Sequence, residues 1–388
     1  MSDRVPLSTV AREWTRIGLI GFGGPPAHIA LFRRLVVEDR GWLEASAFED
    51  AIAACGLLPG PASTQLAILC AYRVAGPAGA IVGGLGFIAP AVILVLIAAR
   101  FLLAASAPPW LRGAGAGAGA AVAVVALQAG LDLAGPSRAR ARARDRGDTR
   151  WAAYLIAGAV AAYLIGPYLV LVLIAAGAVE LAIQRRGRPP TPRPQTPRGV
   201  LSLVSAVSSG GALGPLGWTA LKVGALSFGG GFVIIPLMQG DAVHVYHWMS
   251  GGQFLDAVAL GQVTPGPVVA TVAAVGYAAS GVGGGLFAAA VAFAPSFVFV
   301  LLGARRFEDL RRSPEARAFL DGAGPAAIGA ILGAAATLTV ALSEAWQFGV
   351  LALAAAALLG RRLPVPVTLL AAAGLGVLAA LSGAPLPR

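Results

Sequence analysis

The sequence contains little charge. Only 12% of its 388 residues are Asp, Glu, Lys or Arg, whereas 57% are hydrophobic, and its mean hydropathy is +0.78. Soluble domains carry about 25% charged residues, so a soluble protein with this composition would expose more apolar surface than water tolerates. Intrinsic disorder is excluded because disordered chains are poor in hydrophobic residues. The composition therefore predicts a protein that crosses the lipid bilayer several times.

The chain also lacks most signatures of catalysis and metal binding. Its two cysteines, Cys55 and Cys70, lie in one apolar segment, where burial is expected rather than a disulfide or a redox pair. No glycine-rich loop ends in Gly-Lys-Ser or Gly-Lys-Thr, and His28, His244 and His247 have no metal-ligand spacing. We therefore expect no ATPase, no metal ion, no cofactor and no enzyme.

What the sequence does contain is an internal duplication. Phe22-Gly23-Gly24 recurs as Phe228-Gly229-Gly230, and Pro59-Gly60-Pro61 recurs as Pro265-Gly266-Pro267, at one constant offset. Chance does not keep a single offset across separated motifs, so the chain is expected to consist of two related units.

These units define the expected domains. A first membrane repeat occupies residues 1–183, a second occupies 201–388, and residues 184–200 form a basic, proline-rich linker that is expected to be stiff and solvated. Each repeat contains six apolar segments. Pro59-Gly60-Pro61 divides the second segment into pieces too short to span the bilayer, because proline interrupts the helical hydrogen bonds. The predicted fold is all-α, with discontinuous helices and re-entrant segments.

The distribution of arginine predicts that the repeats are inverted. The loop at 138–150 is rich in arginine, whereas its equivalent at Ser343-Glu344 has no basic residue, and the loop at 305–317 shows the opposite bias. Basic loops remain in the cytoplasm, so the repeats face opposite ways, as in secondary transporters. The scheme gives about ten crossings plus the re-entrant segments. It also explains the net charge of +11 without a nucleic acid partner, although it places the N-terminal arginines outside.

The paired helix breaks are the candidate binding site. A helix that begins inside the membrane presents unpaired N–H groups and the positive end of its dipole, which attract an anion. Inversion would bring the breaks together about a pseudo-two-fold axis. The alternative is a purely structural role in helix packing, which is the more usual one for a single Gly-Gly pair. The candidates are Phe22, Gly23, Gly24, Pro59, Gly60, Pro61, Ser63, Thr64, Phe228, Gly229, Gly230, Thr264, Pro265, Gly266 and Pro267.

Two cations lie at equivalent positions inside apolar segments. Lys222 is the only lysine, and it precedes Phe228 by the same distance as Arg16 precedes Phe22. A charge within the bilayer is costly, so such residues are candidates for function. The alternative is a side chain that extends to the membrane surface. Both cations are candidates for binding a divalent anion.

Two carboxylates also match between the repeats. Asp50 and Asp256 each could carry a coupling proton. Each also lies near the expected start of a helix, where a carboxylate complements the helix dipole. The dipole explanation is the simpler one for both residues.

The order of these motifs resembles the chromate ion transporter family, in its long-chain, two-domain type. The resemblance rests on Phe22-Gly23-Gly24-Pro25, Leu58-Pro59-Gly60-Pro61, Ser227-Phe228-Gly229-Gly230-Gly231 and Thr264-Pro265-Gly266-Pro267, and it covers nearly the whole chain. It implies a secondary transporter that exports chromate across the bacterial inner membrane, confers resistance, and binds the ion at these motifs. The first repeat departs from the second by having Leu58 where the second has Thr264.

Export of a divalent anion is energetically consistent with this resemblance. Two negative charges leaving a cell with a membrane potential of about 100 mV gain roughly 4.6 kcal/mol, so ATP is not required. Two alternatives stay open: a transporter of another tetrahedral oxyanion such as sulfate, and a membrane-embedded enzyme or lipid-handling protein, for which no catalytic set is found. The sequence decides neither proton coupling nor whether the chain forms a homodimer.

Overall fold

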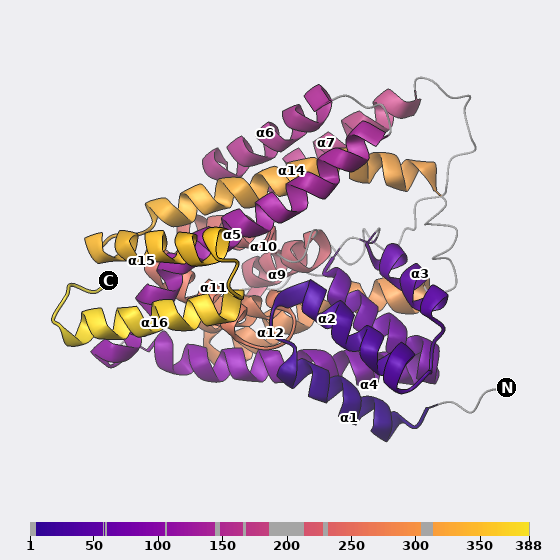
Figure 1. Cartoon of the computed structure of the whole chain (residues 1–388), viewed down its shortest axis with the longest axis horizontal. Coiled ribbons are helices and arrows are strands. Elements are labelled where there is room, and N and C mark those ends of the chain that lie inside the picture. The colour runs from indigo at the N-terminus through magenta and orange to yellow at the C-terminus, as the bar shows by residue number, and fades with distance from the viewer. Residues whose placement is uncertain are drawn as a thin grey trace.

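All regular secondary structure in the described part of the chain is helical. The computed structural model describes residues 5–56, 58, 60–104, 107–143, 148–165, 168–185, 213–227, 232–303 and 313–387. The helices run mostly along the longest axis of the molecule (Figure 1).

The N-terminal half begins with three short helical segments and continues with four longer helices. The short segments are α1 (Leu7–Ile20), α2 (Gly24–Arg33), which continues as the π-helix η1 (Arg34–Asp39), and α3 (Ala45–Cys55). The longer helices are α4 (Ala62–Leu102), α5 (Pro109–Ala143), α6 (Asp148–Leu164) and α7 (Leu169–Arg185).

The C-terminal half repeats this order. Its short segments are α9 (Gly214–Leu226), α10 (Ile234–Gln239), which continues as the π-helix η4 (Gly240–Val245), and α11 (Gly251–Val263). They are followed by η5 (Val268–Thr271), which continues as α12 (Val272–Gly303), and by α14 (Pro314–Val340), α15 (Ala345–Ala355) with η6 (Ala356–Gly360), and α16 (Val365–Leu381). Even the π-helices η1 and η4 begin at equivalent positions.

Several of these helices are suited to the bilayer. In the part of the chain that is described, 4 stretches are long and apolar enough to cross a membrane: α4, α5, η5 with α12, and α14. Large apolar side chains such as Ile97, Phe101 and Leu302 are exposed on α4 and α12, as expected for surfaces that face lipid. The predicted all-α polytopic membrane fold is confirmed.

The helix breaks occur where the sequence predicts them. Helix α3 ends at Cys55 and α4 begins at Ala62, while α11 ends at Val263 and η5 begins at Val268. Each break contains a glycine with a left-handed backbone, Gly60 (φ 115°) and Gly266 (φ 100°), a conformation that only glycine adopts without strain.

The first break is the tip of a helical hairpin formed by α3 and the first part of α4. The Arg73 guanidinium, near the end of the returning segment, donates a hydrogen bond to the carbonyl of Ala47 at the start of α3. The chain then reverses at Gly76 (φ 71°), so that a Cβ on Gly79 would lie 2.5 Å from the Ala71 carbonyl oxygen. The residues of α4 beyond this kink form the long span. Gly281 (φ 62°) occupies the equivalent kink of α12.

The two halves exchange their last helices. Helix α5 packs against α15 and α16, while α14 packs against α6 and α7. Figure 1 shows α5 beside α16 although they are far apart in the sequence. Glycines allow this close approach: a Cβ on Gly117 would lie 2.2 Å from the Ala372 carbonyl, and one on Gly329 would lie 1.8 Å from the Leu155 carbonyl. Small residues at such contacts are typical of helices packed in lipid.

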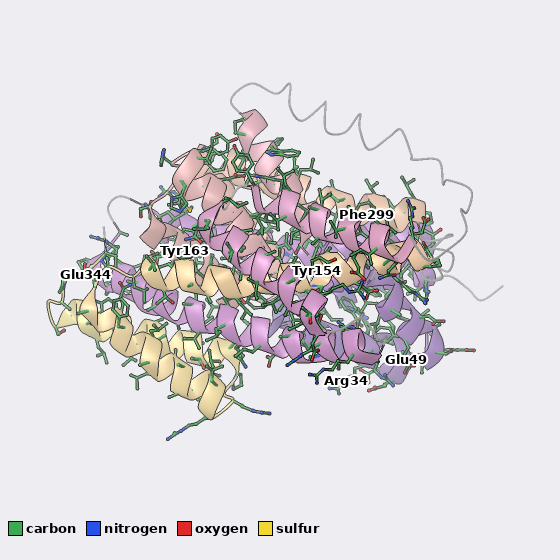
Figure 2. The ribbon with its side chains drawn as sticks, turned by 90° about the horizontal axis from the view of Figure 1, so that it is seen from above. Arg34, Glu49, Tyr154, Tyr163, Phe299 and Glu344 are labelled. Carbon is green, nitrogen blue, oxygen red and sulfur yellow. The ribbon has the colours of Figure 1, made fainter. Side chains whose placement is uncertain are left out.

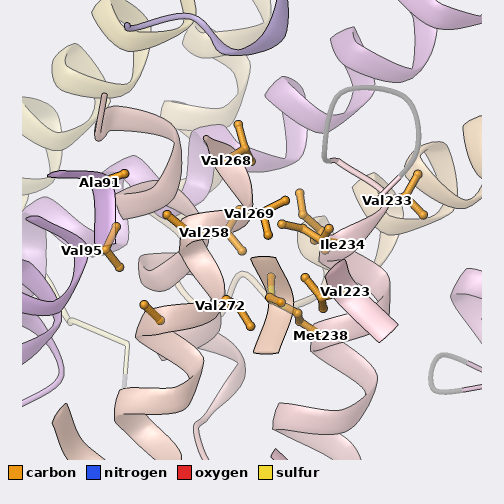
Figure 3. Packing of buried hydrophobic residues seen from close by; sticks show 14 of the residues in the cluster. Ala91, Val95, Val223, Val233, Ile234, Met238, Val258, Val268, Val269 and Val272 are labelled. Carbon is orange, nitrogen blue, oxygen red and sulfur yellow. The ribbon is translucent and has the colours of Figure 1, made fainter. Parts of the chain in front are cut away.

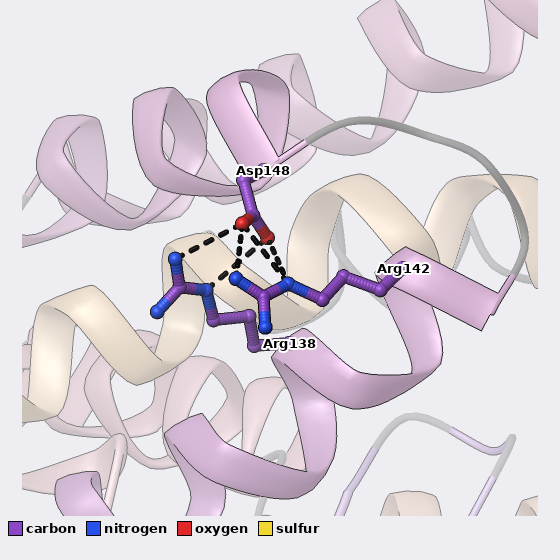
Figure 4. Close-up of polar contacts among 3 residues, drawn as sticks. All are labelled: Arg138, Arg142 and Asp148. Carbon is purple, nitrogen blue, oxygen red and sulfur yellow. Dashed lines mark hydrogen bonds and ion pairs between the residues drawn. The ribbon is translucent and has the colours of Figure 1, made fainter.

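The arginine-rich end of α5 is tied to the start of α6. Arg138 and Arg142 donate hydrogen bonds to the Asp148 carboxylate, which lies in the first turn of α6 (Figure 4). These bonds, first from Arg142 and then from Arg138, hold the pKa of Asp148 well below its usual range. Asp148 therefore remains ionised and joins the two helices at ordinary pH.

Candidate functional site

A cavity of about 410 Å³ lies where the helix breaks of the two halves meet. Both halves contribute to its wall: Gly23 and Gly24 at the start of α2, Gly60 and Ala62 at the first Pro-Gly-Pro, and Thr264, Gly266 and Val268 at the second. One side is closed by α5, through residues including Gln128 and Asp132. The breaks that the sequence places far apart thus border one space.

Three helix starts border this cavity. Helix α2 begins at Gly24, α4 begins at Ala62, and η5, which leads into α12, begins at Val268; all three residues line the cavity. The first N–H groups of a helix have no partner within that helix, and the dipole is positive at this end. Pro25 and Pro26 remove N–H groups from the first turn of α2, so α4 and η5 provide most of the backbone donors.

A hydrogen-bond network locks the breaks of the two halves together. The Gly266 N–H donates to the Gly21 carbonyl over 2.9 Å, and Nε2 of the buried His28 donates to the same oxygen over 2.9 Å. His28 Nδ1 is then the unprotonated nitrogen and accepts from the Ser63 hydroxyl at 3.3 Å. Sequence reasoning missed His28, because its equivalent in the other half is Ile234 and no motif surrounds it.

Each Pro-Gly-Pro also packs on the first helix of the opposite half. A Cβ on Gly60 would lie 3.0 Å from the Gly224 carbonyl of α9, and one on Gly266 would lie 3.4 Å from the Gly18 carbonyl of α1. Gly18 and Gly224 are themselves equivalent positions. These crossed contacts are those that a pseudo-two-fold relation between the halves requires.

Apolar side chains support the second break from behind. They come from α9, α10 and the residue before it, α11, η5 and the start of α12, with two residues of α4 packed beside them (Figure 3). The labelled residues are Ala91, Val95, Val223, Val233, Ile234, Met238, Val258, Val268, Val269 and Val272. This packing buries the residues behind the break and supports the position of its backbone donors.

Several buried polar groups at the cavity have no partner among the described residues. Gln262, which is 9% exposed, has an unpaired Nε2, and Gln128 has an unpaired Oε1; both residues line the cavity. Leaving such a group unpaired costs about 1–3 kcal/mol, so it usually marks a place for a ligand or water. Asp132 also lines the cavity, but its side chain is exposed, and it forms no hydrogen bond or ion pair with another described residue.

Sequence reasoning overlooked Gln128 and Asp132. Asp132 is a single carboxylate in the apolar run of α5 and has no equivalent acid in α14, so a search for matched residues does not find it. The isolation of a charge in an apolar helix was the available signal.

The predicted residues at the breaks fall into three groups. Five line the cavity: Gly23, Gly24, Gly60, Thr264 and Gly266. Pro61 caps α4, Ser63 bonds to His28, Thr64 is buried with an unpaired hydroxyl, Pro265 and Pro267 flank Gly266, and Phe22 is 47% exposed. Pro59, Phe228, Gly229 and Gly230 lie outside the described residues.

Lys222 is buried in an ion pair. Its Nζ lies 2.6 Å from Oδ2 of Asp241 on η4, and the Thr219 hydroxyl donates to the same oxygen over 2.6 Å. Nζ also lies 5.8 Å from the centre of the Trp218 ring, in the range of a cation–π contact. Lys222 does not line the central cavity.

Arg16 has a different environment from its equivalent Lys222. Its side chain is 70% exposed and lies 3.7 Å from the Glu13 carboxylate. Glu13 is nearly buried and also receives a 2.7 Å hydrogen bond from Arg40. In each half an ion pair therefore joins the first helix to the π-helix region that follows the second. In the first half the acid, Glu13, is on the first helix and Arg40 is its partner; in the second half the base, Lys222, is on the first helix and Asp241 is its partner.

The two matched carboxylates also differ from each other. Asp50 is exposed on α3, whereas Asp256 lines a second cavity of about 270 Å³ together with Arg112 and Gln347. Asp256 faces α5, where a Cβ on Gly115 would lie 2.8 Å from its Oδ1. Helix α11 therefore reaches from this second cavity, at Asp256, to the central one, at Gln262.

The fold and the cavity define an all-α polytopic membrane protein with a cavity between discontinuous helices. Within this class, the chain belongs to the chromate transporter family: the family described as "Chromate transporter" matches residues 8–181 and 215–377. The match includes every helix that borders the central cavity.

Individual relatives agree with this assignment. The chain is 32% identical over 383 residues to a chromate transport protein of Cupriavidus metallidurans, a match that covers 96% of this chain and 93% of the relative. It is 28% identical over 384 residues to a probable chromate transport protein of Synechococcus elongatus, covering 96% and 95%. An uncharacterized transporter of Methanocaldococcus jannaschii is 26% identical over 316 residues, covering 78% and 76%. No solved structure matches the chain significantly.

Proposed function

We propose that this protein is a secondary transporter that exports chromate from the bacterial cytoplasm across the inner membrane. The observation that carries the proposal is the single cavity bordered by the helix starts of α2, α4 and η5. Helix starts attract anions without any basic side chain. The names of the relatives, and the apolar spans around the cavity, support chromate and a membrane location.

The proposed anion cradle is built mainly from backbone. No basic side chain is present among the described residues that line the cavity. The N–H groups at the start of α4 and η5, the amide of Gln262 and the hydroxyl of Thr264 are the donors that an oxyanion would meet. A tetrahedral anion has four oxygens, so donors that converge from several directions suit it better than one salt bridge.

The charged residues have separate places in the proposal. In the present conformation Asp241 compensates Lys222 and Glu13 compensates Arg16. We assign Arg16 and Lys222 to anion contacts in another conformation of the transport cycle. Asp50 and Asp256 remain the proposed proton-coupling carboxylates, Asp256 through the second cavity that it shares with Arg112.

Alternating access is proposed to follow from two inverted repeats, at 1–183 and 201–388, joined by the linker 184–200. The crossed packing of Gly60 on Gly224 and of Gly266 on Gly18 supports this relation. Each repeat would open the cavity toward a different face. The gain of roughly 4.6 kcal/mol for two charges at about 100 mV then drives export without ATP.

Uptake of chromate into everted membrane vesicles tests the proposal. Vesicles that contain the protein should accumulate chromate faster than empty vesicles, with sulfate uptake measured in parallel. The variant Gln262→Leu should lower the rate about tenfold or more, since a hydrogen bond to a charged group contributes about 1.5–3 kcal/mol. Gln184→Leu on α7 is the matched control: it removes an amide that bonds to Glu180 and lines no part of the cavity, so transport per folded molecule should equal that of the unmodified protein.

Equal chromate uptake by vesicles with and without the protein would refute the function. Uptake of sulfate but not of chromate would assign the scaffold to another tetrahedral oxyanion. Equal rates for Gln262→Leu and Gln184→Leu would remove the central cavity as the binding site.

A further inference from the structure

The central cavity and the second cavity lie one after the other along α5 and α11. On α5, Ala116 lines the second cavity and Val125 lines the central one. On α11, Asp256 lines the second cavity and Gly261 lines the central one. Five residues of an α-helix rise about 7.5 Å, so only a thin layer of protein separates the two spaces.

This layer is tightly packed. On α5 it consists of residues 117–124, all of which are buried. A Cβ on Gly117 would lie 2.2 Å from the Ala372 carbonyl of α16, and one on Gly119 would lie 3.0 Å from the Leu255 Cβ of α11. Because these contacts have no room for an added methyl group, they leave no passage for an oxyanion.

The two cavities face opposite ends of the molecule. Asp132, which lines the central cavity and is exposed, lies on α5 six residues before Arg138 in the arginine-rich end that is predicted to be cytoplasmic. The second cavity is lined by Ala341 and Gln347, on either side of the Ser343-Glu344 loop that is predicted to be outside. In this conformation the central cavity is therefore closed toward the predicted outer face.

The C-terminal segment 385–387 covers the outer side of the layer. Pro387 lines the second cavity, and its carbonyl accepts a 2.7 Å hydrogen bond from the Arg112 guanidinium near the start of α5. The Pro385 carbonyl accepts a 2.9 Å hydrogen bond from the indole N–H of Trp346 near the start of α15. Figure 1 shows this end of the chain beside α15 and α16. The segment thus joins the outer ends of two helices that pack on each other.

We propose that residues 117–124 of α5 form the outer gate of the transporter, and that Arg112 and Trp346 hold this gate closed through the segment 385–387. The inference rests on the alternating access of the proposed function. Arg112 precedes the gate by little more than one helical turn, so a movement of α5 away from α11 and α16 also withdraws its guanidinium from Pro387. Small sliding movements of packed helices are a known way to open such a layer.

The two hydrogen bonds are suited to a contact that breaks in every cycle. Arg112 and Pro385 are exposed, so water replaces each lost bond and the net cost of breaking it is modest. Arg112 acts as a positioning residue, because its contact is with the C-terminal segment and it does not line the central cavity.

Labelling of a cysteine behind the gate tests the inference without requiring transport. In the full chain with Cys55 and Cys70 replaced by alanine, Ala129→Cys places a thiol in the wall of the central cavity. A small, impermeant, anionic methanethiosulfonate should label it rapidly in everted vesicles and slowly in right-side-out vesicles. Adding Arg112→Met should raise the rate in right-side-out vesicles about three- to tenfold, because the closed conformation loses one of its hydrogen bonds. Trp346→Phe, which removes only one N–H group, should change the rate in the same direction and provides the measurement if Arg112→Met does not accumulate in the membrane.

Arg185→Met is the matched control. Arg185 is also exposed and also forms a 2.7 Å bond between helices, in its case from α7 to Glu315 on α14. It lines neither cavity, so its variant should be labelled at the rate of the parent protein.

The results separate the inference from the function. If Arg112→Met and Trp346→Phe are both labelled at the parent rate, the gate contacts are refuted. Rapid labelling of the parent protein from the outside would refute the closed layer itself. Chromate uptake is measured in everted vesicles of the same preparations. If there is none while Arg112→Met still accelerates labelling, the proposed function fails and the gate stands.

Discussion

Lys222 illustrates how far a single residue can be interpreted from sequence. Its isolation in an apolar segment predicts an unusual environment, and the structure places it in a buried ion pair with Asp241. The partner was not predictable. Asp241 lies on another helix, its equivalent in the first half is Leu35, and pairing across a π-helix has no sequence spacing that would reveal it.

The pair predicts a specific pattern of stability. Lys222→Met and Asp241→Leu should each destabilise the protein by about 3–5 kcal/mol, because each leaves one buried charge without its partner. The double variant should recover most of this loss, since no charge remains. Thermal unfolding of the purified protein in detergent measures both effects.

Arg16→Met is the matched control, because Arg16 occupies the equivalent position but is exposed. Its effect should be about 0–1 kcal/mol, as for other surface pairs. Additive destabilisation in the Lys222 and Asp241 double variant would contradict the assignment of a mutually compensating pair.

The helix breaks were the most predictable elements. Proline interrupts helical hydrogen bonds, so Pro-Gly-Pro predicts where a helix ends. The ends of α3 and α11 and the starts of α4 and η5 lie on either side of this motif. The arrangement of the breaks around one cavity was inferred only through symmetry. The contribution of α5 to the wall was not predicted, because nothing in its sequence states which neighbouring element faces Gln128 and Asp132.

The two glycines at the breaks should not tolerate a side chain. Gly60→Ala and Gly266→Ala place a Cβ on a left-handed residue, at a cost of about 1–2 kcal/mol. In addition, the Cβ would lie 2.7 Å from Gln65 Nε2 or 2.8 Å from Ala91 Cβ. Both variants should unfold at lower temperature and transport more slowly.

Gly374→Ala is the control for this substitution. Gly374 lies within α16 with nothing near its Cβ position, so alanine should be neutral or stabilise the helix by up to about 1 kcal/mol. Comparable losses at Gly374 and Gly60 would show that the effect does not come from the breaks.

At the scale of the whole molecule, the arginine bias predicts which end of the helices faces the cytoplasm. Figure 2 shows Glu344 at one end of the helices, and Arg34 with Glu49 at the other. The sequence predicts that the loop at Ser343-Glu344 is outside and that Arg34 is in the cytoplasm. The packing of α5 on α15 and α16, and of α14 on α6 and α7, was not predicted. A hydrophobic pattern predicts that a segment is a helix, but it does not indicate which other helix packs against it.

This topology predicts the labelling of two engineered cysteines. With Cys55 and Cys70 replaced by alanine, Ser343→Cys should react with an impermeant maleimide in right-side-out vesicles, and Ala143→Cys should react in everted vesicles. Both positions are exposed. The cysteine-free protein is the control, and labelling of both positions from the same face would contradict the scheme.

One carbonyl oxygen joins the two halves at their centre. The oxygen of Gly21 accepts from His28 of its own half and from Gly266 of the other. A displacement of either break withdraws a donor from this shared acceptor, so the free energy of moving one break depends on where the other stands. Independent breaks would at times open together and let ions leak down their gradients. A shared atom makes the two movements conditional on each other, which is the thermodynamic requirement for a transporter that does not behave as a channel.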